Sequence, residues 1–253
     1  RLLEAGEVRW TRRAHRMLSA ILDAQVDAPP DLDGCFPILV GRAVGDRNAN
    51  LFLLPHLLDV WTAHGEALDT DLRERLGRQL CRAITFVERR WDHELFDLHR
   101  DHKAYSNIFA LYIRSLFRAA EALDDARLAD NALAQWRRWF HHVSYFGVDE
   151  FASPTYNAVC LEALLDIRAH TADASVVRET GLLVDHLCEL QLAMHHPRLN
   201  VPLCGMSRDY RLYIDLAGRR WPVVLSGREL AADTMDGHAV PDRLIEEYRN
   251  RSY

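Results

Sequence analysis

The sequence predicts an all-α protein made of antiparallel helical hairpins. Apolar residues repeat every three or four positions over most of residues 8–195. Short turns join these periodic stretches, so successive helices are expected to run in opposite directions. Almost wholly apolar stretches also alternate with stretches that are charged on one face. This alternation favours an α/α toroid, in which an inner ring of buried helices lies inside an outer ring. It argues against a four-helix bundle, because all four helices of a bundle would be equally amphipathic.

The composition is that of a soluble globular protein, because 49% of the 253 residues are hydrophobic and 27% are charged. A net charge of −6 argues against a nucleic-acid-binding surface. The sequence has no run of about 18 apolar residues, so no membrane span or membrane partner is expected. Five cysteines without a CxxC pair predict neither a disulfide framework nor a structural zinc site, and they favour a cytoplasmic location.

The first three predicted helices span residues 8–25, 49–64 and 71–91. Proline and glycine mark the loop between the first two, at Pro29-Pro30 and Asp33-Gly34. Asp69 and Asp71 stand at the start of the third helix, where an acidic side chain can cap the free N–H groups.

The next four predicted helices span residues 104–123, 126–143, 153–169 and 175–195. The helices over 104–123 and 153–169 are apolar around most of their circumference, which predicts burial on several sides. Asp124-Asp125 is interpreted as a cap in a tight turn. Ser153 is a favoured N-cap residue, and Pro154 suits the first helical position.

After Pro197 the helical pattern breaks down. Residues 199–225 alternate in places and predict short strands or an ordered loop, and a last helix is expected over 240–250. We therefore expect residues 1–198 to form the helical hairpins and residues 199–253 to pack on the same domain. The first residues already have a helical pattern, as though a segment preceded them.

Four segments occur in an order that resembles the six-hairpin, glycosidase-like α/α-toroid family. They are Asn48–Leu58 (NANLFLLPHLL), Tyr105–Phe109 (YSNIF), Glu150–Tyr156 (EFASPTY) and Gly205–Tyr210 (GMSRDY). The resemblance covers most of residues 45–215. It implies similarity to polysaccharide lyases and glycoside hydrolases, which bind sugar chains in a cleft at one end of the ring.

The sequence departs from this family in two respects. A complete ring has about twelve helices, whereas seven or eight are predicted here, so the ring is expected to be incomplete or open. The family's usual Arg-Ser-Tyr order near the last segment is replaced by Ser207-Arg208-Asp209-Tyr210.

Polar residues gather where the even-numbered helices begin. In a toroid these helices run in the same sense, so their N-termini, with free N–H groups and positive dipole ends, are expected to meet at one rim. The candidate catalytic residues are His56, Glu150, Tyr156 and Arg208. The candidate substrate-binding residues are Asn50, Tyr105, Asn107, Asp149, Asn157 and Tyr210.

These residue types suit a lyase that acts on uronates. Such an enzyme neutralises a carboxylate, removes the C5 proton and protonates the leaving oxygen, and Asn or Arg suits the first task while Tyr or His suits the others. A glycosidase instead needs two carboxyl groups on either side of one bond. Asp149 and Glu150 are sequence neighbours and do not easily meet that need. No metal ion or cofactor is expected, and the expected ligand is an oligosaccharide or a small molecule.

Structural interpretations stay open for every candidate. The asparagines suit helix capping, Tyr156 suits the core, Glu150 suits a helix dipole, and His56 suits a buried hydrogen bond. Two other functions also stay open. One is an isomerase, dehydratase or cyclase that acts on a small apolar, terpenoid-like molecule. The other is a non-catalytic interaction domain with an exposed apolar patch.

Overall fold

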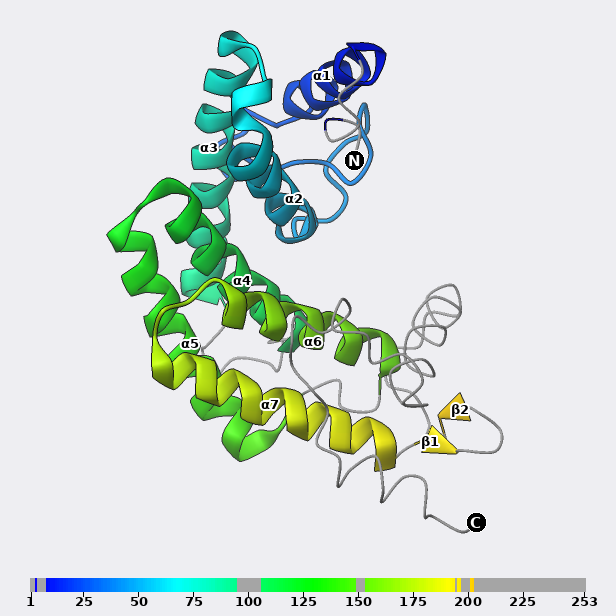
Figure 1. The fold of residues 1–253 in the computed structure, drawn as a ribbon, viewed down its shortest axis with the longest axis vertical. Coiled ribbons are helices and arrows are strands. Elements are labelled where there is room, and N and C mark those ends of the chain that lie inside the picture. Colours follow the sequence, from blue (N-terminus) through cyan, green and yellow to red (C-terminus); the bar gives the residue numbers. More distant parts are fainter. Residues whose placement is uncertain are drawn as a thin grey trace. The chain divides into compact units, whose positions relative to one another are not determined.

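The computed structural model describes residues 3, 8–94, 106–148, 153–193, 195–196 and 201–202. Over these residues the regular secondary structure is helical apart from two strands of two residues each (Figure 1). The elements are α1 (Val8–Asp23), α2 (Ala49–His64), the 3₁₀ helix η1 (Gly65–Ala67), α3 (Thr70–Glu94), α4 (Ser106–Leu123), α5 (Ala126–Phe146), α6 (Pro154–Ala169), α7 (Ala174–Ala193), β1 (His195–His196) and β2 (Val201–Pro202). The prediction of an all-α protein is confirmed for this part of the chain.

The chain divides into two compact units, and the division falls inside helices. The first unit comprises residues 1–103 and 115–131, and the second comprises residues 104–114 and 132–253. Helix α4 therefore begins in the second unit and ends in the first, while α5 begins in the first and ends in the second.

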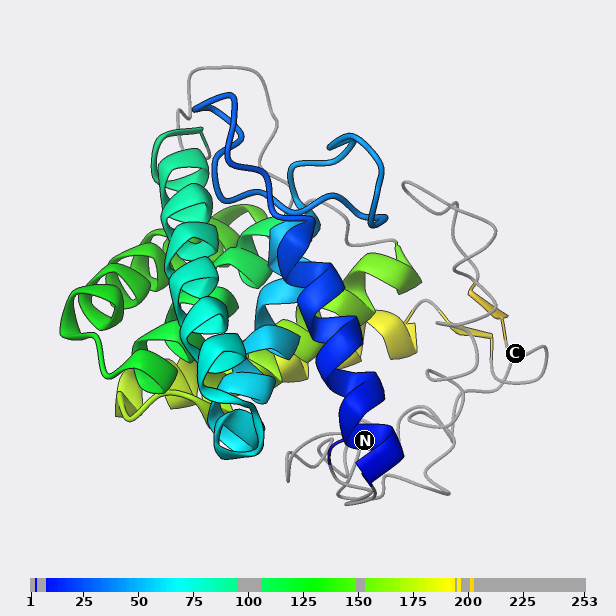
Figure 2. The same cartoon turned by 90° about the horizontal axis from the view of Figure 1, so that it is seen from above.

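The first unit is organised around the hairpin of α2 and α3. The apolar stripe of α2 contributes Leu51, Leu54 and Leu58 to the core, and that of α3 contributes Leu76 and Leu80, all of them fully buried. Helix α1 packs on α3, and Figures 1 and 2 both show it beside this hairpin. Each helix buries the stripe that its 3.6-residue periodicity predicts.

The second unit contains the hairpin of α6 and α7, which lie side by side and antiparallel (Figure 1). Helix α5 is tied to α7 by the indole of Trp136, whose Nε1–H donates to Glu179 Oε2 at 2.7 Å. The Trp136 ring also stacks on Phe140 with the ring centres 5.8 Å apart. Two buried tryptophans, Trp136 and Trp139, thus form much of the apolar core that α5 contributes here.

The predicted contrast in burial between helices is confirmed for α4 in comparison with α3 and α5. Every residue from Ser106 to Phe117 of α4 is buried, although these residues include an arginine and several polar side chains. Helices α3 and α5 each keep one exposed face. A helix that is apolar around most of its circumference gains stability only when several neighbours cover it.

Three predicted helix starts are confirmed by their capping hydrogen bonds. Asp69 Oδ1 accepts from the N–H of Leu72 at 2.9 Å, and Asp125 Oδ1 accepts from the N–H of Leu128 at 3.1 Å. Ser153 Oγ accepts from the N–H group of the third residue after it, at 3.3 Å. Each bond satisfies one of the N–H groups that the first helical turn leaves unpaired.

Several predicted helix ends differ from the observed ones. Helix α5 continues to Phe146 and ends at Gly147, whose φ of +75° is the left-handed conformation that commonly follows a helix. Helix α7 ends at Ala193, two residues before the predicted end. His196 lies in β1, as expected for a residue that precedes proline and is therefore disfavoured in a helix.

The C-terminal predictions are only partly covered. The two-residue strands pair antiparallel, with His195 opposite Pro202 and His196 opposite Val201. The rest of the 199–225 region, and the helix predicted over 240–250, lie outside the described residues. Within the described part of the chain, no helix combines the length and apolar character that crossing a bilayer requires.

Candidate functional site

The start of α6 is the best-defined part of the predicted site. Ser153 has an extended backbone (φ −100°, ψ 109°), and Pro154 follows as the first helical residue. The side chains of Ser153 and Asn157 are buried, whereas Tyr156 between them is half-buried. The capping bond holds the first turn rigid, so the Tyr156 phenol projects from a fixed backbone at a helix N-terminus.

The start of α4 has the same character and belongs to the same compact unit. Ser106 and Asn107 are the first two residues of α4, and both are buried. Together with Ser153 and Asn157 they make four polar side chains, each at most 2% exposed, at two helix N-termini of the second unit. Buried polar groups cost free energy unless they are hydrogen-bonded, so such a concentration marks a polar interior at these helix starts.

Asn50, by contrast, belongs to the first unit and binds the loop between α1 and α2, residues 24–48. Its Oδ1 accepts from the N–H of Phe36 at 2.7 Å, and its Nδ2 donates to the carbonyl of Gly34 at 2.9 Å. A longer contact of 3.4 Å joins Nδ2 to the carbonyl of Ala83 in α3. The Asn50 side chain is fully buried. In this structure the amide of Asn50 therefore satisfies backbone groups of the protein itself.

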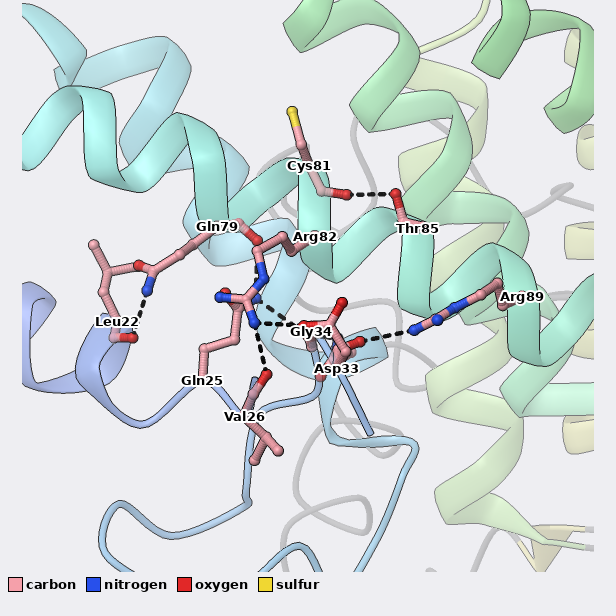
Figure 3. A network of polar contacts seen from close by, with 11 residues as sticks. Leu22, Gln25, Val26, Asp33, Gly34, Gln79, Cys81, Arg82, Thr85 and Arg89 are labelled. Carbon is pink, nitrogen blue, oxygen red and sulfur yellow. Dashed lines mark hydrogen bonds and ion pairs between the residues drawn. The ribbon is translucent and has the colours of Figure 1, made fainter. Parts of the chain in front are cut away.

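Polar side chains of α3, and Gln25 of the loop itself, bind backbone groups of the same loop and of α3 (Figure 3). Arg82 Nη2 donates to the carbonyl of Val26 at 3.1 Å and also to the Asp33 carboxylate, and Arg89 donates to the Asp33 carbonyl at 2.9 Å. Gln25 Nε2 donates to the carbonyls of Gly34 and Gln79, at 3.1 and 2.9 Å. These bonds give a segment without regular secondary structure the backbone partners that it cannot supply for itself.

His56 is not the buried histidine that one interpretation of the sequence predicts. Its side chain is exposed on α2, with Nδ1 4.0 Å from Asp59 Oδ2, so the buried, hydrogen-bonded histidine is not what the structure shows. His56 and Asn50 lie in the first unit, whereas Tyr156, Asn107 and Asn157 lie in the second. The other predicted site residues, Tyr105, Asp149, Glu150, Arg208 and Tyr210, fall outside the described residues.

A buried arginine that sequence reasoning missed lies in the second unit. The Arg114 side chain is only 7% exposed, and its Nη1 and Nε lie 3.6 and 3.8 Å from carboxylate oxygens of Glu162 and Asp166 on α6. The other Asp166 oxygen lies 3.2 Å from Nε2 of His170. Two carboxylates thus compensate one buried guanidinium between α4 and α6. The available signal was a single arginine inside the apolar stretch from Ser106 to Phe117.

The buried cysteines are poorly suited to nucleophilic chemistry. Burial raises the pKa of the Cys35 thiol from its ordinary value of 9.0 to about 11, and it raises that of Cys188 to about 12. The thiolate is the reactive form, so both side chains stay protonated and unreactive near neutral pH. Among the described residues, no group of three or more His, Cys, Asp or Glu side chains is arranged to hold a metal ion.

Aromatic side chains of α4 and α2, which could in principle line a pocket for an apolar molecule, make contacts within the protein. Phe109, Tyr112 and Phe117 of α4 are buried, and the Phe109 and Tyr112 rings lie 5.6 Å apart. Trp61 of α2 donates from Nε1 to the carbonyl of Ala122 at 3.2 Å. The three α4 rings therefore have the ordinary environment of core residues, whereas Trp61 is half-buried.

Comparisons with protein-family models, with curated proteins and with solved structures find no match to this chain.

Proposed function

We propose that the chain forms part of an α/α toroid and is a carbohydrate-active enzyme whose site includes the starts of α4 and α6. The observation that carries this proposal is the burial of Ser106, Asn107, Ser153 and Asn157 at two helix N-termini of one compact unit. The much greater burial of α4 compared with α3 and α5 supports the toroid, in which inner helices are covered on all sides.

The proposed chemistry is β-elimination from a uronate residue. The amides of Asn107 and Asn157 and the positive ends of the α4 and α6 dipoles favour a substrate carboxylate and the charge that develops on it. Neutralising that carboxylate makes the C5 proton acidic enough for a side-chain base to remove. The C5–H and C4–O4 bonds then break, a C4=C5 double bond forms, and the leaving oxygen takes a proton.

Tyr156 is the proposed proton carrier at this site. Tyr156 is half-buried, and its backbone is fixed by the Ser153 cap. Glu150, three residues before that cap in the sequence, is the proposed second acid or base. Proton transfer by a positioned side chain contributes about 10²–10⁴-fold to a reaction rate.

The test uses the full chain with polygalacturonate, alginate and a neutral glucan as substrates. Elimination creates a conjugated double bond that absorbs ultraviolet light, whereas hydrolysis creates new reducing ends without that absorbance. We expect absorbance to rise with a uronate polymer, and Tyr156→Phe to lower kcat about 100-fold. Tyr145→Phe, on the exposed face of α5 in the same unit, is the matched control and should keep kcat within about twofold.

Two results would overturn the proposed function. One is the absence of any product from all three polymers with a protein that unfolds cooperatively on heating. The other is full activity of the Tyr156→Phe variant. New reducing ends without ultraviolet absorbance would replace the lyase with a hydrolase at the same site.

A non-catalytic interaction domain is the second candidate, and one observation favours it. Three consecutive apolar side chains, Ile38, Leu39 and Val40, are each at least 60% exposed in the loop before α2. Contiguous exposed apolar surface is typical of protein-binding sites. Failure of the substrate test, together with loss of partner capture in a variant with all three side chains changed to Ser, would support this candidate instead.

A further inference from the structure

The loop between α1 and α2 contains an exposed stretch that few contacts hold. Residues 38–43 are all exposed, and the first three of them, which are apolar, are each at least 60% exposed. Within residues 37–45, all of which the structure describes, a single hydrogen bond is present, from the N–H of Arg42 to the carbonyl of Leu39 at 3.1 Å. One exposed hydrogen bond adds little net stability, so this turn opens at low cost.

Both ends of this exposed stretch are held by the rest of the first unit. Before it, Phe36 is buried, and its N–H donates to Asn50 Oδ1 at 2.7 Å. After it, Arg47 Nη2 donates to Asp31 Oδ2 at 2.9 Å, and α2 begins two residues later. These two contacts close the base of the loop, as in an Ω-loop, whose ends lie close together. The chain on each side of residues 37–45 is therefore held independently of the stretch between.

Arg42 lies in the middle of this stretch and has no carboxylate partner among the residues that the structure describes. Gly41, directly before it, has φ +80°, and a Cβ atom there or at Gly45 would meet nothing within 4 Å. Glycine adopts almost any backbone conformation, so the chain around Arg42 can straighten without a clash. Arg47, the next arginine of the loop, is paired with Asp31 instead. Arg42 is therefore the arginine of this loop that a protein partner can reach most easily.

We propose that the Arg42–Ala43 peptide bond is a processing site for an arginine-specific serine endoprotease. Such an enzyme receives the arginine side chain in a pocket with a carboxylate at its base, and its cleft needs an exposed stretch of substrate around the bond. In the reaction water adds across the C–N bond. The carbonyl carbon of Arg42 takes the hydroxyl group and becomes a carboxylate, and the nitrogen of Ala43 takes the proton and becomes an amino group.

Other exposed arginines of the described residues lie within helices. Arg12, Arg137 and Arg178, on α1, α5 and α7, have exposed side chains, but their peptide bonds belong to helical turns. A helix must open locally before a protease can bind the chain around one of these bonds, and that opening limits the rate of cleavage. The loop around Arg42 needs no helix to open. Its geometry therefore favours cleavage there over cleavage in the helices.

Cleavage at this bond should leave the protein folded. The chain before the cut is held by hydrogen bonds from Asn50, Arg82 and Arg89 to the loop. The chain after the cut enters α2, which buries Leu51 and Leu54 in the core. The two new charged groups form in an exposed stretch, where water solvates them at little cost. The cut therefore frees one end of the exposed apolar run while both fragments stay in the same folded unit.

The experiment treats the folded full chain with a small amount of trypsin and measures the initial rate at which each new chain end appears, by mass spectrometry. We expect the chain that begins at Ala43 to form about 100-fold faster than chains produced by cleavage after Arg12, Arg137 or Arg178. Arg42→Gln should abolish this product. Arg137→Gln, which removes an exposed arginine from α5, is the matched control and should leave the rate of the Ala43 product within about twofold.

Size-exclusion chromatography then tests whether the cut protein stays assembled. We expect the fragment that ends at Arg42 to elute with the remainder of the chain in native buffer and to separate from it in urea. Three results would overturn the proposal. They are the same products at the same rates from Arg42→Gln and the wild-type protein, equal rates of cleavage after Arg12 and Arg42, and dissociation of the fragments without urea. No saccharide enters this test, so its outcome is independent of the proposed enzymatic function.

Discussion

Gly34 lies directly against the backbone carbonyl of Arg82. A Cβ atom at position 34 would overlap the carbonyl oxygen, lie 2.7 Å from the carbonyl carbon and lie 3.2 Å from Cβ of Phe86. The φ of Gly34 is +86°, in the left-handed region that side chains disfavour. The loop before α2 therefore approaches α3 as closely as it does only because residue 34 has no side chain.

Gly34→Ala should lower the free energy of unfolding by about 3 kcal/mol or more. The left-handed backbone costs an L-residue about 1–2 kcal/mol, and the clash with a backbone carbonyl adds to it because backbone cannot rotate away. Gly41→Ala is the matched control, because Gly41 has φ +80° but its Cβ would meet nothing within 4 Å. Urea denaturation of the two variants measures the difference, and equal losses would show that the close approach is unimportant.

Asn50→Ala should lower the free energy of unfolding by about 2–4 kcal/mol. The change leaves the buried N–H of Phe36 and the buried carbonyl of Gly34 without the partners that Asn50 supplies. Asn48→Ala should cost less than about 0.5 kcal/mol, since the Asn48 side chain makes no capping bond. Chemical denaturation compares the two, and a variant at position 50 as stable as the wild-type protein would contradict the structural role of Asn50.

Arg127→Ala should destabilise the protein more than Arg78→Ala, although the two arginine side chains are 65% and 68% exposed. Glu88, the partner of Arg127, has a side chain only 12% exposed, whereas Glu74, the partner of Arg78, is 64% exposed. Losing Arg127 leaves a buried carboxylate with one partner fewer and should cost about 1–2 kcal/mol. Losing Arg78 should cost less than about 0.5 kcal/mol.

A double-mutant cycle checks the cause. If Glu88→Gln removes most of the effect of Arg127→Ala, the effect comes from this ion pair. If Arg127→Ala costs the same stability in the Glu88→Gln background, the loss does not come from this ion pair.

Alkylation should discriminate between the cysteines of the folded protein. Cys81 is exposed, whereas burial raises the pKa of Cys35 to about 11 and that of Cys188 to about 12. Iodoacetamide at mildly alkaline pH should therefore modify Cys81 about a hundredfold faster than the other two, as read by mass spectrometry. In urea the three rates should become similar. Fast labelling of Cys35 in the folded state would contradict its burial.

The raised pKa values of Cys35 and Cys188 predict that the protein becomes less stable at alkaline pH. Well below pH 9.0 both the folded and the unfolded thiols keep their protons, so the two residues add no pH dependence there. Above it the unfolded chain loses protons that the folded protein retains, and the free energy of unfolding falls as the pH rises toward 11. Cys35→Ser/Cys188→Ala should lessen this alkaline decline when stability is measured at several pH values.

Asp173 should make the stability of the protein depend on pH in the acidic range. Its carboxylate accepts from the Ser175 hydroxyl and from the N–H groups of Val176 and Ser175, and these bonds lower its pKa below the ordinary value. The contribution is present above the ordinary carboxyl pKa and is lost as the pH falls through the lowered one. Asp173→Ala should therefore be destabilising near neutral pH and neutral in strong acid, as measured by thermal unfolding. The same loss at both pH values would contradict this role.

Helix positions were the most predictable part of this protein. The Ser153-Pro154 start and the Asp69 and Asp125 caps are decided by the hydrogen-bonding needs of one helical turn, which adjacent residues meet. The ends were predicted less well. Helix α5 continues through Ser144, Tyr145 and Phe146, because helix ends depend on where the chain turns back on itself as much as on local preference.

The candidate site was predictable only in part. A polar start of α6 followed from the sequence, and so did a polar start of α4. The role of Asn50 did not, because its partners Phe36, Gly34 and Ala83 are 14 to 33 residues away and belong to a loop and a different helix. The same holds for Arg114, whose compensating carboxylates lie on α6.

Periodicity and capping act over a single turn, so the amino-acid sequence alone predicts which residues form helices, where most helices begin and that α4 is buried. Contacts between distant residues settle which polar side chains bind the protein's own backbone and which stay exposed. Asn50 and Arg82 bind a loop, whereas Arg12, Arg13 and Arg16 face outward without a carboxylate partner among the described residues. A hydrogen bond or an ion pair needs two groups within a few ångströms, and folding alone brings distant residues that close.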